Sequence, residues 1–349
     1  MKKVLIATFV VMVSFWSCDT DSVESETPQE EQLHQDLGVD LEELSRISEH
    51  GVGRQCHSMN VLARQLNDNP GMLQRMQNIE LHTRNFKKPA GNGNGGGNGN
   101  GGGDPAPDEV GLITIPVYVH VIYNTSQQNI SSSQINSQIA VLNDDFRKSN
   151  SDASQVPSEF AGLAADSEIE FVLAGVTRKS SSVTSWGTND AMKYASNGGV
   201  DVITPETHLN IWVCNIGGGI LGYAQFPGGG ASTDGVVISP QYFGSQGYVS
   251  APFNKGRTAT HEVGHYLNLR HIWGDGRCKR DDFVSDTPSS DGPNYGCPSY
   301  PTKNCRSNDM TMNYMDYTDD ACMYMFSEGQ KSRMRALFLA GGVRESMLN

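Results

Sequence analysis

The sequence has 349 residues, 37% of them hydrophobic, which allows one sizeable domain accompanied by a smaller folded piece. The formal net charge is -13, and residues 19–49 alone hold eleven acidic side chains against a single arginine. We interpret this tract as a solvated spacer. The remaining sequence lacks basic clusters interleaved with aromatic residues, which excludes nucleic acid as an expected partner.

The N-terminal residues 1–17 have the layout of a secretory signal. Two lysines precede an apolar run over residues 4–16, which is too short to cross a bilayer. Cys18 then follows a serine, and this arrangement resembles the bacterial lipoprotein signal. We predict export to the cell envelope or cell surface, with lipidated Cys18 as the only membrane attachment and residues 18–50 as a flexible acidic tether. A plain signal peptide is the alternative, and processing would release the protein from the cell.

A linker separates the two folded pieces. Residues 91–108 begin with an uninterrupted run of Gly and Asn, which cannot bury apolar surface and therefore predicts random coil. Upstream, within residues 51–90, apolar side chains recur at helical spacing over residues 60–81, with a break at residues 69–71. We predict two short helices there that pack on the main domain, residues 109–349.

The main domain opens with a Val/Ile-rich stretch that predicts a buried strand, and a long amphipathic helix follows it. Four further strands and two more helices complete the pattern. The predicted strands cover residues 113–123, 168–176, 209–216, 221–226 and 236–239, and the predicted helices cover residues 131–147, 258–269 and 328–339, the last capped by Ser327. This order of elements predicts an α/β fold with a mixed twisted sheet.

The string from His261 to His271 reads His-Glu-Val-Gly-His-Tyr-Leu-Asn-Leu-Arg-His. On a helix, His261 and His265 project from one face a turn apart and can share a Zn²⁺ ion. His271 can join them only where the chain turns sharply, and Asn268 is placed to take the positive φ of such a turn. Three histidines leave a fourth position open, as in catalytic zinc sites. Glu262 is placed to activate the zinc-bound water as a general base, which predicts peptide hydrolysis.

This motif is similar to that of the metzincin zinc metallopeptidases, and within them to the pappalysin family with its cytophagalysin-like bacterial members. The family has Gly where this chain has Asn268. Residues 313–317, Asn-Tyr-Met-Asp-Tyr, resemble the family's Met-turn, and the resemblance covers most of the chain from Arg54 onward. It implies a metzincin catalytic domain in which Met315 forms an apolar floor beneath the zinc. It also implies that Tyr317 stabilises the developing oxyanion, although a buried tyrosine that merely finds a partner for its hydroxyl is an equal alternative.

The upstream piece carries a second resemblance. Arg54-Gln55-Cys56 resembles the family's pro-segment motif, although His57 stands where the family usually has Gly. This implies a latent zymogen in which the Cys56 thiolate fills the open zinc position until the segment is cut away. A Cys56–Cys214 disulfide is the alternative; otherwise Cys214 is a buried free thiol. The candidate cut points are Arg84, Lys87 and Lys88.

Four further cysteines admit three pairings in an exported protein. The resemblance favours Cys278–Cys305 and Cys297–Cys322. These bonds would tie the long loop after the zinc-binding helix to the Met-turn region. Closing loops of this length stabilises a fold by roughly 3 kcal/mol each in a chain-entropy estimate. The disulfides would therefore hold one wall of the cleft.

The same loop contains Asp281, Asp282 and Asp286, and clustered carboxylates suit Ca²⁺, which some relatives bind. Solvated loop acids are the other interpretation. Some relatives also favour basic substrate residues through an acid beyond the Met-turn. Asp319 and Asp320 lie in that part of this sequence, but the sequence assigns neither of them to a pocket.

Residues 221–226 resemble the metzincin edge strand that binds substrate by strand addition. The Gly-rich flanks at residues 217–219 and 228–230 suit either close backbone approach or simple turns. We predict a secreted zinc endopeptidase that acts on proteins or peptides, and a narrow processing protease is the alternative with the same fold. Two alternatives come from other classes of protein. A zinc-holding adhesin would not need Glu262, and a nutrient-binding lipoprotein would have no ordered metal ligands.

Overall fold

A computed structural model describes residues 56–86 and 110–348. The predicted signal at residues 1–17, Cys18, the acidic tether and the Gly/Asn linker all lie outside these ranges, as do Arg54, Gln55, Lys87 and Lys88 of the predicted upstream motif and cut points. Within the described part of the chain, no helix has the length and apolar character needed to span a bilayer.

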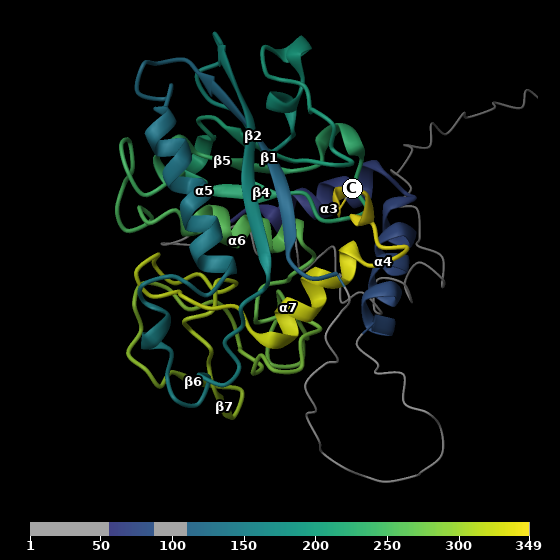
Figure 1. Ribbon diagram of the computed structural model, residues 1–349, viewed down its shortest axis with the longest axis vertical. Coiled ribbons are helices and arrows are strands. Elements are labelled where there is room, and N and C mark those ends of the chain that lie inside the picture. The colour runs from purple at the N-terminus through teal and green to yellow at the C-terminus, as the bar shows by residue number, and fades with distance from the viewer. Residues whose placement is uncertain (1–55, 87–109, 349) are drawn as a thin grey trace, which may run out of the picture.

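A five-stranded mixed sheet forms the centre of the protein, with the strand order β2-β1-β3-β5-β4 (Figure 1). The pairs β1–β2, β1–β3 and β3–β5 are parallel, whereas β4 is antiparallel to β5 and forms one edge. The strands are β1 (Ile113–Tyr123), β2 (Ile169–Ser180), β3 (Leu209–Val213), β4 (Gly222–Ala224) and β5 (Val236–Ile238). The predicted mixed sheet is therefore present, although β3, β4 and β5 are shorter than the apolar runs suggested.

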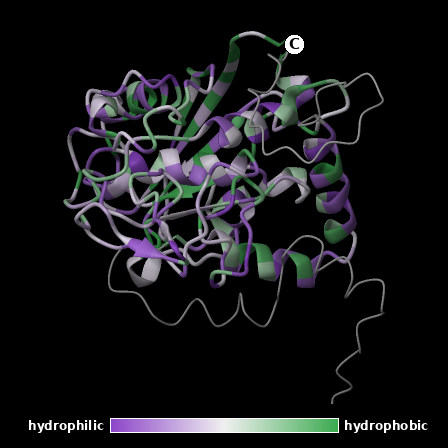
Figure 2. Ribbon diagram, turned by 90° about the horizontal axis from the view of Figure 1, so that it is seen from below, coloured by the Kyte–Doolittle hydropathy of each residue, from purple (hydrophilic) through white to green (hydrophobic). Residues whose placement is uncertain are grey.

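Both faces of the sheet are covered at its centre, since every residue of β3 is buried, whereas the edge strand β2 is exposed along much of its length. On one face, helices α5 (Ser132–Phe146) and α6 (Arg257–Tyr266) pack against the sheet and each other. On the other face, Trp186, Trp212 and Tyr223 belong to a second buried cluster. In Figure 2 the long strands carry much of the hydrophobic colour, whereas the loops are mostly white and purple.

Serine caps begin two helices. Ser131 accepts a hydrogen bond from the Gln134 backbone and begins α5. Ser327 forms a capping box with Gln330 and begins α7 (Glu328–Arg335). The helix predicted to reach residue 339 ends at Arg335 and continues as a 3-10 turn. The 3-10 turns are η1 (Ala153–Gln155), η2 (Ala191–Lys193), η3 (Ala195–Asn197), η4 (Gly217–Gly219), η5 (Ala231–Thr233), η6 (Pro240–Tyr242), η7 (Ala336–Phe338) and η8 (Glu345–Leu348).

The upstream piece forms two helices, α3 (Ser58–Asp68) and α4 (Met72–Phe86), which are separated at residues 69–71. Helix α3 lies against β4, and α4 lies against η7. Phe226, just beyond β4, packs into an apolar cluster with side chains of α3 and α4. Both helices therefore dock on the main domain, on the right-hand side of Figure 1.

The chain between α6 and α7 is largely irregular and contains only the short pair β6 (Lys303–Asn304) and β7 (Ser307–Asn308). Two disulfides join it, Cys278 to Cys305 and Cys297 to Cys322. Each closes a loop of about 25 residues, for which the chain-entropy estimate is roughly 3 kcal/mol. These bonds restrain a segment that has little regular hydrogen bonding of its own.

Candidate metal centre

Helix α6 and the turn after it bring three histidines together. His261 and His265 lie one turn apart on α6, and Asn268 takes φ 71° and reverses the chain. His271 thereby returns to the helix face. Its Nε2 lies 3.3 Å from Nε2 of His261 and 3.1 Å from Nε2 of His265.

A second hydrogen bond fixes the orientation of each imidazole. Nδ1 of His261 donates to the Tyr314 carbonyl at 2.7 Å, and Nδ1 of His265 donates to the Leu269 carbonyl at 2.8 Å. Nδ1 of His271 pairs with the buried Asp275 carboxylate. Because the outer nitrogens are occupied, all three Nε2 atoms remain for a shared ion. This donor set fits Zn²⁺.

A fourth candidate ligand comes from the upstream piece. Cys56 Sγ lies 3.5 Å from Nε2 of His265, and it shares a potential metal site with all three histidines. A parallel bridge to Gly222 of β4 holds this residue, and the His57 backbone N–H donates to the Gly222 carbonyl at 3.1 Å. Cys56 is therefore positioned by the edge of the sheet.

The site is buried, and burial changes its acid–base chemistry. Burial and the nearby Glu262 raise the pKa of the Cys56 thiol well above its usual value. Burial and the neighbouring His271 lower the pKa of His265. Neutral imidazole is the form that binds metal, whereas the thiol requires a cation to become a thiolate here. A bound metal therefore favours the arrangement of all four side chains.

Glu262 lies beside the point where the ligands converge and is 1% exposed. Its Oε2 accepts a hydrogen bond from Ser58 Oγ at 2.7 Å and lies 3.3 Å from Cys56 Sγ. Gly222 permits this approach, because a Cβ there would lie 3.2 Å from Glu262 Cγ and 2.9 Å from a backbone oxygen. The carboxylate thus faces the position that the thiol fills.

Met315 and Tyr317 flank the centre. A Cβ added at Gly264 of α6 would lie 2.4 Å from Met315 Sδ, so the methionine packs directly under the helix. The Tyr317 ring lies 4.8 Å from that of His271, and its hydroxyl donates to the Cys56 carbonyl at 3.3 Å. Tyr317 therefore has a hydrogen-bond acceptor beside the three histidines.

The structure also tests the alternative disulfide and the predicted loop acids. Cys56 and Cys214 are both free and buried, so the alternative disulfide between them is absent. Asp320 Oδ2 accepts from two backbone N–H groups at the start of α6, which makes it an anchor of that helix and not a pocket residue. Asp282 accepts from Val284 and Thr287 of its own loop.

Asp286 accepts hydrogen bonds from the Ser327 hydroxyl and the Gly329 backbone at the start of α7, and Asp281 accepts one from the Phe283 backbone N–H. The two candidate metal clusters within residues 56–86 and 110–348 include none of the three acids predicted for calcium. The geometry therefore gives calcium no support.

Two hydrogen bonds to the proposed site residues were not predicted from the sequence. Asp275, which orients His271, stands four residues after that histidine, and this short spacing was a usable signal. Ser58, which binds Glu262, is 204 residues away from it in the chain. No sequence pattern indicates that second contact.

The sequence is similar to a known peptidase family and to extracellular metalloproteases. The peptidase M43 family model, described as pregnancy-associated plasma protein-A, matches residues 200–339. An extracellular metalloprotease of Arthroderma benhamiae is 32% identical over 230 residues, which cover 64% of this chain and 76% of that protein. One from Pyricularia oryzae is 34% identical over 241 residues, with 65% and 75% covered.

The chain is also similar to solved structures of metallopeptidases. Mature mirolysin of Tannerella forsythia in complex with a cleaved peptide is 49% identical, with a TM-score of 0.67, and the match covers 69% of this chain and 96% of that one. A promirolysin mutant from the same organism is 43% identical, with a TM-score of 0.73, and 84% and 97% are covered. The longer match to the precursor extends the similarity over a larger share of the present chain.

Proposed function

This chain belongs to the peptidase M43 family of zinc metalloendopeptidases, and on that premise we propose that His261, His265 and His271 hold its zinc while Glu262 acts as general base. The predicted pappalysin resemblance, the α/β metzincin fold and the zinc metalloendopeptidase activity are confirmed. The convergence of three Nε2 atoms, with a buried carboxylate beside them, is the observation that carries the proposed residue roles.

When bound, zinc supplies a Lewis acid that polarises the scissile carbonyl and lowers the pKa of a water molecule. Glu262 then takes a proton from the attacking water and delivers it to the leaving amine. Its burial beside the histidines supports this role. Asp275 orients His271 through Nδ1 and keeps Nε2 directed inward.

Tyr317 is our candidate for oxyanion stabilisation. Its hydroxyl already donates to a peptide carbonyl in the cleft, that of Cys56. A substrate carbonyl in that place would accept the same hydrogen bond, and the bond would strengthen as negative charge develops on the oxygen. Met315 supports the helix that carries two of the ligands.

We assign substrate binding to β4. This strand is the sheet edge beside the metal centre, and the backbone around Cys56 already pairs with it at Gly222. Main-chain pairing suits a protease that accepts many sequences. The complex of mature mirolysin with a cleaved peptide supports peptides as the substrate class.

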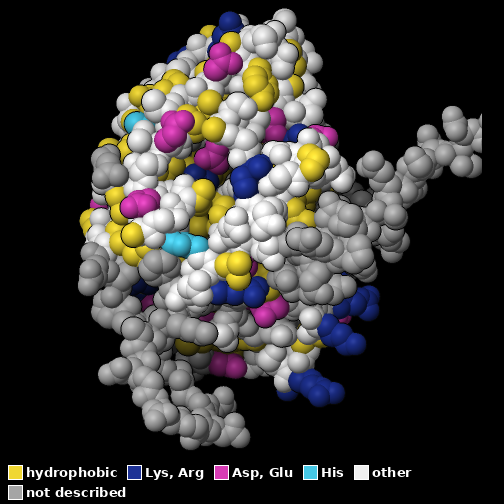
Figure 3. All heavy atoms as spheres, turned by 90° about the vertical axis from the view of Figure 1, so that its right-hand side faces the viewer, with side chains coloured by type: hydrophobic (Ala, Val, Ile, Leu, Met, Phe, Trp, Pro, Cys, Tyr) yellow, Lys and Arg dark blue, Asp and Glu magenta, His cyan; other side chains and the backbone are white. Residues whose placement is uncertain are grey.

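Residues 51–90 act, in this proposal, as a pro-segment. Cys56 fills the fourth ligand position. Helices α3 and α4 lie on the right-hand side of Figure 1, and this side faces the viewer in Figure 3. The promirolysin structure supports synthesis as a zymogen. Cleavage at Arg84, Lys87 or Lys88, or elsewhere before residue 109, would separate this segment from the catalytic domain at residues 109–349.

The relatives named extracellular metalloproteases support export. We retain two finer expectations from the sequence: lipidation of Cys18, and Ca²⁺ binding in the loop after α6. Mass spectrometry of the N-terminal peptide from membrane fractions tests the first. Calcium titration of the zinc-loaded enzyme, followed by thermal unfolding, tests the second.

The decisive experiment compares activated wild type with the Glu262→Gln variant on a peptide library, each with and without chelator. We expect the variant to bind a full equivalent of zinc and to lose activity by a factor of about 10² to 10⁴. Zinc content by metal analysis is the control for folding. Activity that survives in the variant, or in the presence of chelator, would contradict the assigned mechanism.

A further inference from the structure

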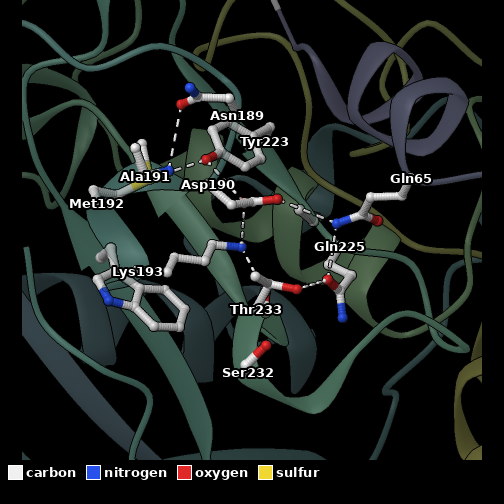
Figure 4. Close-up of polar contacts among 12 residues, drawn as sticks. Gln65, Asn189, Asp190, Ala191, Met192, Lys193, Tyr223, Gln225, Ser232 and Thr233 are labelled. Atoms are coloured by element: carbon white, nitrogen blue, oxygen red, sulfur yellow. Dashed lines mark hydrogen bonds and ion pairs between the residues drawn. The ribbon is translucent and has the colours of Figure 1, made fainter. Parts of the chain in front are cut away.

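Asp190 is a buried acid outside the metal centre. It lies in the loop between β2 and β3, directly before η2, and its side chain is 3% exposed. Lys193 Nζ lies 2.8 Å from its Oδ1, and the Tyr223 hydroxyl of β4 donates to the same oxygen at 3.1 Å (Figure 4). The catalytic domain therefore holds one oxygen of this carboxylate in place.

The other oxygen faces the pro-segment. Arg64 of α3 pairs with Asp190 Oδ2, and Gln65 Nε2 donates to it at 3.3 Å. Among the described residues these two are the hydrogen-bond partners of Oδ2. Both leave when the pro-segment is removed. Activation therefore frees a charged acceptor that is already fixed in position.

Asp190 pairs with a second cation in addition to Lys193. Its ammonium is fully buried, lies 5.1 Å from the centre of the Trp212 ring and donates to the Thr233 carbonyl at 2.6 Å. Burial alone would raise the pKa of Asp190, yet Lys193 and Arg64 hold it below its usual value. The precursor thus shows that this carboxylate binds a second cation while it keeps the first.

There is room for a side chain beside this carboxylate. A pocket of about 180 Å³ lies between Arg64 and Gln65 on the pro-segment side and the backbone around Asp190 and Thr233 on the catalytic side. Removal of α3 opens this pocket to the cleft. The Asn189–Tyr194 loop and the Gly230–Thr233 turn remain as its walls.

The location of the Asp190 pocket along β4 indicates which part of a substrate reaches the pocket. The Ala224 backbone N–H donates to Ser58 Oγ at 2.8 Å, and Gln65 Nε2 donates to the Gln225 side-chain oxygen at 2.9 Å. Helix α3 therefore covers the strand from Gly222 towards Gln225. A substrate antiparallel to β4 would place there the residues that precede its scissile bond.

We propose that Asp190 is a specificity residue that binds a basic side chain of the substrate, at the second, third or fourth residue before the scissile bond. Arg64 of the pro-segment occupies this subsite in the precursor. The range of positions follows from a strand rise of about 3.3 Å per residue and the reach of an arginine. The proposal rests on the function proposed above and adds a substrate class to it.

The test uses full-length chain that has been activated by limited proteolysis and loaded with zinc. Peptides differ only by arginine or its uncharged isostere citrulline at each of the three positions. We expect kcat/KM to be about tenfold higher for arginine at one position, chiefly through KM, as for a partly buried ion pair. In Asp190→Asn this preference should fall to within about twofold.

Asp190→Asn leaves Lys193 buried without its counterion, so the variant Asp190→Asn/Lys193→Met, which removes both charges, serves as a second test. Asp166→Asn is the matched control, because Asp166 pairs with Arg147 next to β2 at the opposite edge of the sheet. The control should keep the wild-type preference. Thermal unfolding and zinc content verify that each variant folds.

Two results overturn the inference while the proposed function stands. One is zinc-dependent cleavage with equal rates for arginine and citrulline at all three positions. The other is an arginine preference that persists in both Asp190 variants. A failure of every peptide to be cleaved in a zinc-dependent manner would instead reject the proposed function itself.

Discussion

The proposed pro-segment contacts the proposed catalytic domain in two unlike regions. At one end, Cys56 enters the metal centre, where its thiol has an acid and an imidazole as neighbours and a pKa raised by burial. At the other end, Glu80 of α4 meets Arg333 of α7 through two hydrogen bonds of 3.0 and 2.5 Å. The first contact places a buried thiol beside a carboxylate and an imidazole, whereas the second is a buried ion pair.

The region around Glu80 is strongly basic. The guanidinium groups of Arg84, Arg270 and Arg333 lie 4.9, 4.8 and 5.5 Å from the centre of the Phe283 ring. Burial and the neighbouring Arg333 lower the pKa of Arg270 to about 10. Glu80 is the pro-segment acid that offsets this charge. Blocking the metal centre and holding the proposed pro-segment in place therefore depend on different residues, and separate variants should affect them.

The largest effect should come from Cys56→Ala in the precursor. If Cys56 is the fourth zinc ligand, its loss should weaken zinc binding on the order of 100-fold, because each ligand contributes several kcal/mol. Competition with a chelator measures this. Cys214→Ala, which removes the other buried free thiol, is the control and should bind zinc as wild type does. Equal zinc affinity in all three proteins would exclude Cys56 as a ligand.

Glu80→Gln should leave the zinc affinity unchanged and weaken the docking of α4 on the main domain. A buried pair that loses one partner leaves a charge uncompensated, and we expect docking to weaken by about 2 to 3 kcal/mol. Hydrogen exchange in α3 and α4 measures this opening. Asp68→Asn on α3 is matched, because its carboxylate is 66% exposed in its pair with Arg64 and should contribute under about 0.5 kcal/mol. Equal exchange in both variants would refute the distinction.

The smallest effect is the pH dependence of the same pair. Burial raises the pKa of Glu80, but the charge of Arg333 outweighs it and lowers the pKa from 4.5 to about 2. Stability from this carboxylate is therefore present above pH 4.5 and is lost as the pH falls towards 2. The difference in unfolding free energy between wild type and Glu80→Gln should shrink across that window. A difference that stays constant from pH 5 to pH 2.5 would show that Glu80 does not titrate in this way.

Local patterns predicted most elements and the three histidines that the structure brings together. The spacing of His261, His265 and His271 is a property of one short string, and Asn268 takes the positive φ that the turn requires. The buried strand at residues 113–123 also matches its predicted bounds, since its apolar composition is a local signal. Such features depend on neighbours in the sequence.

Contacts between distant segments were not predictable in this way. Asp190 and Arg64 are 126 positions apart, and Glu80 and Arg333 are 253 apart. Each pair combines ordinary charged residues that a sequence would assign to a solvated surface. Only the docking of α3 and α4 on the main domain brings the partners together and buries them.

The parallel bridge between Cys56 and Gly222 also bears on self-digestion. A substrate antiparallel to β4 would run opposite to the backbone around Cys56, which pairs with this strand in parallel. The backbone around Cys56 would then present its peptide groups to Glu262 the wrong way round. Cleavage of the proposed zymogen would therefore have to occur elsewhere in the chain.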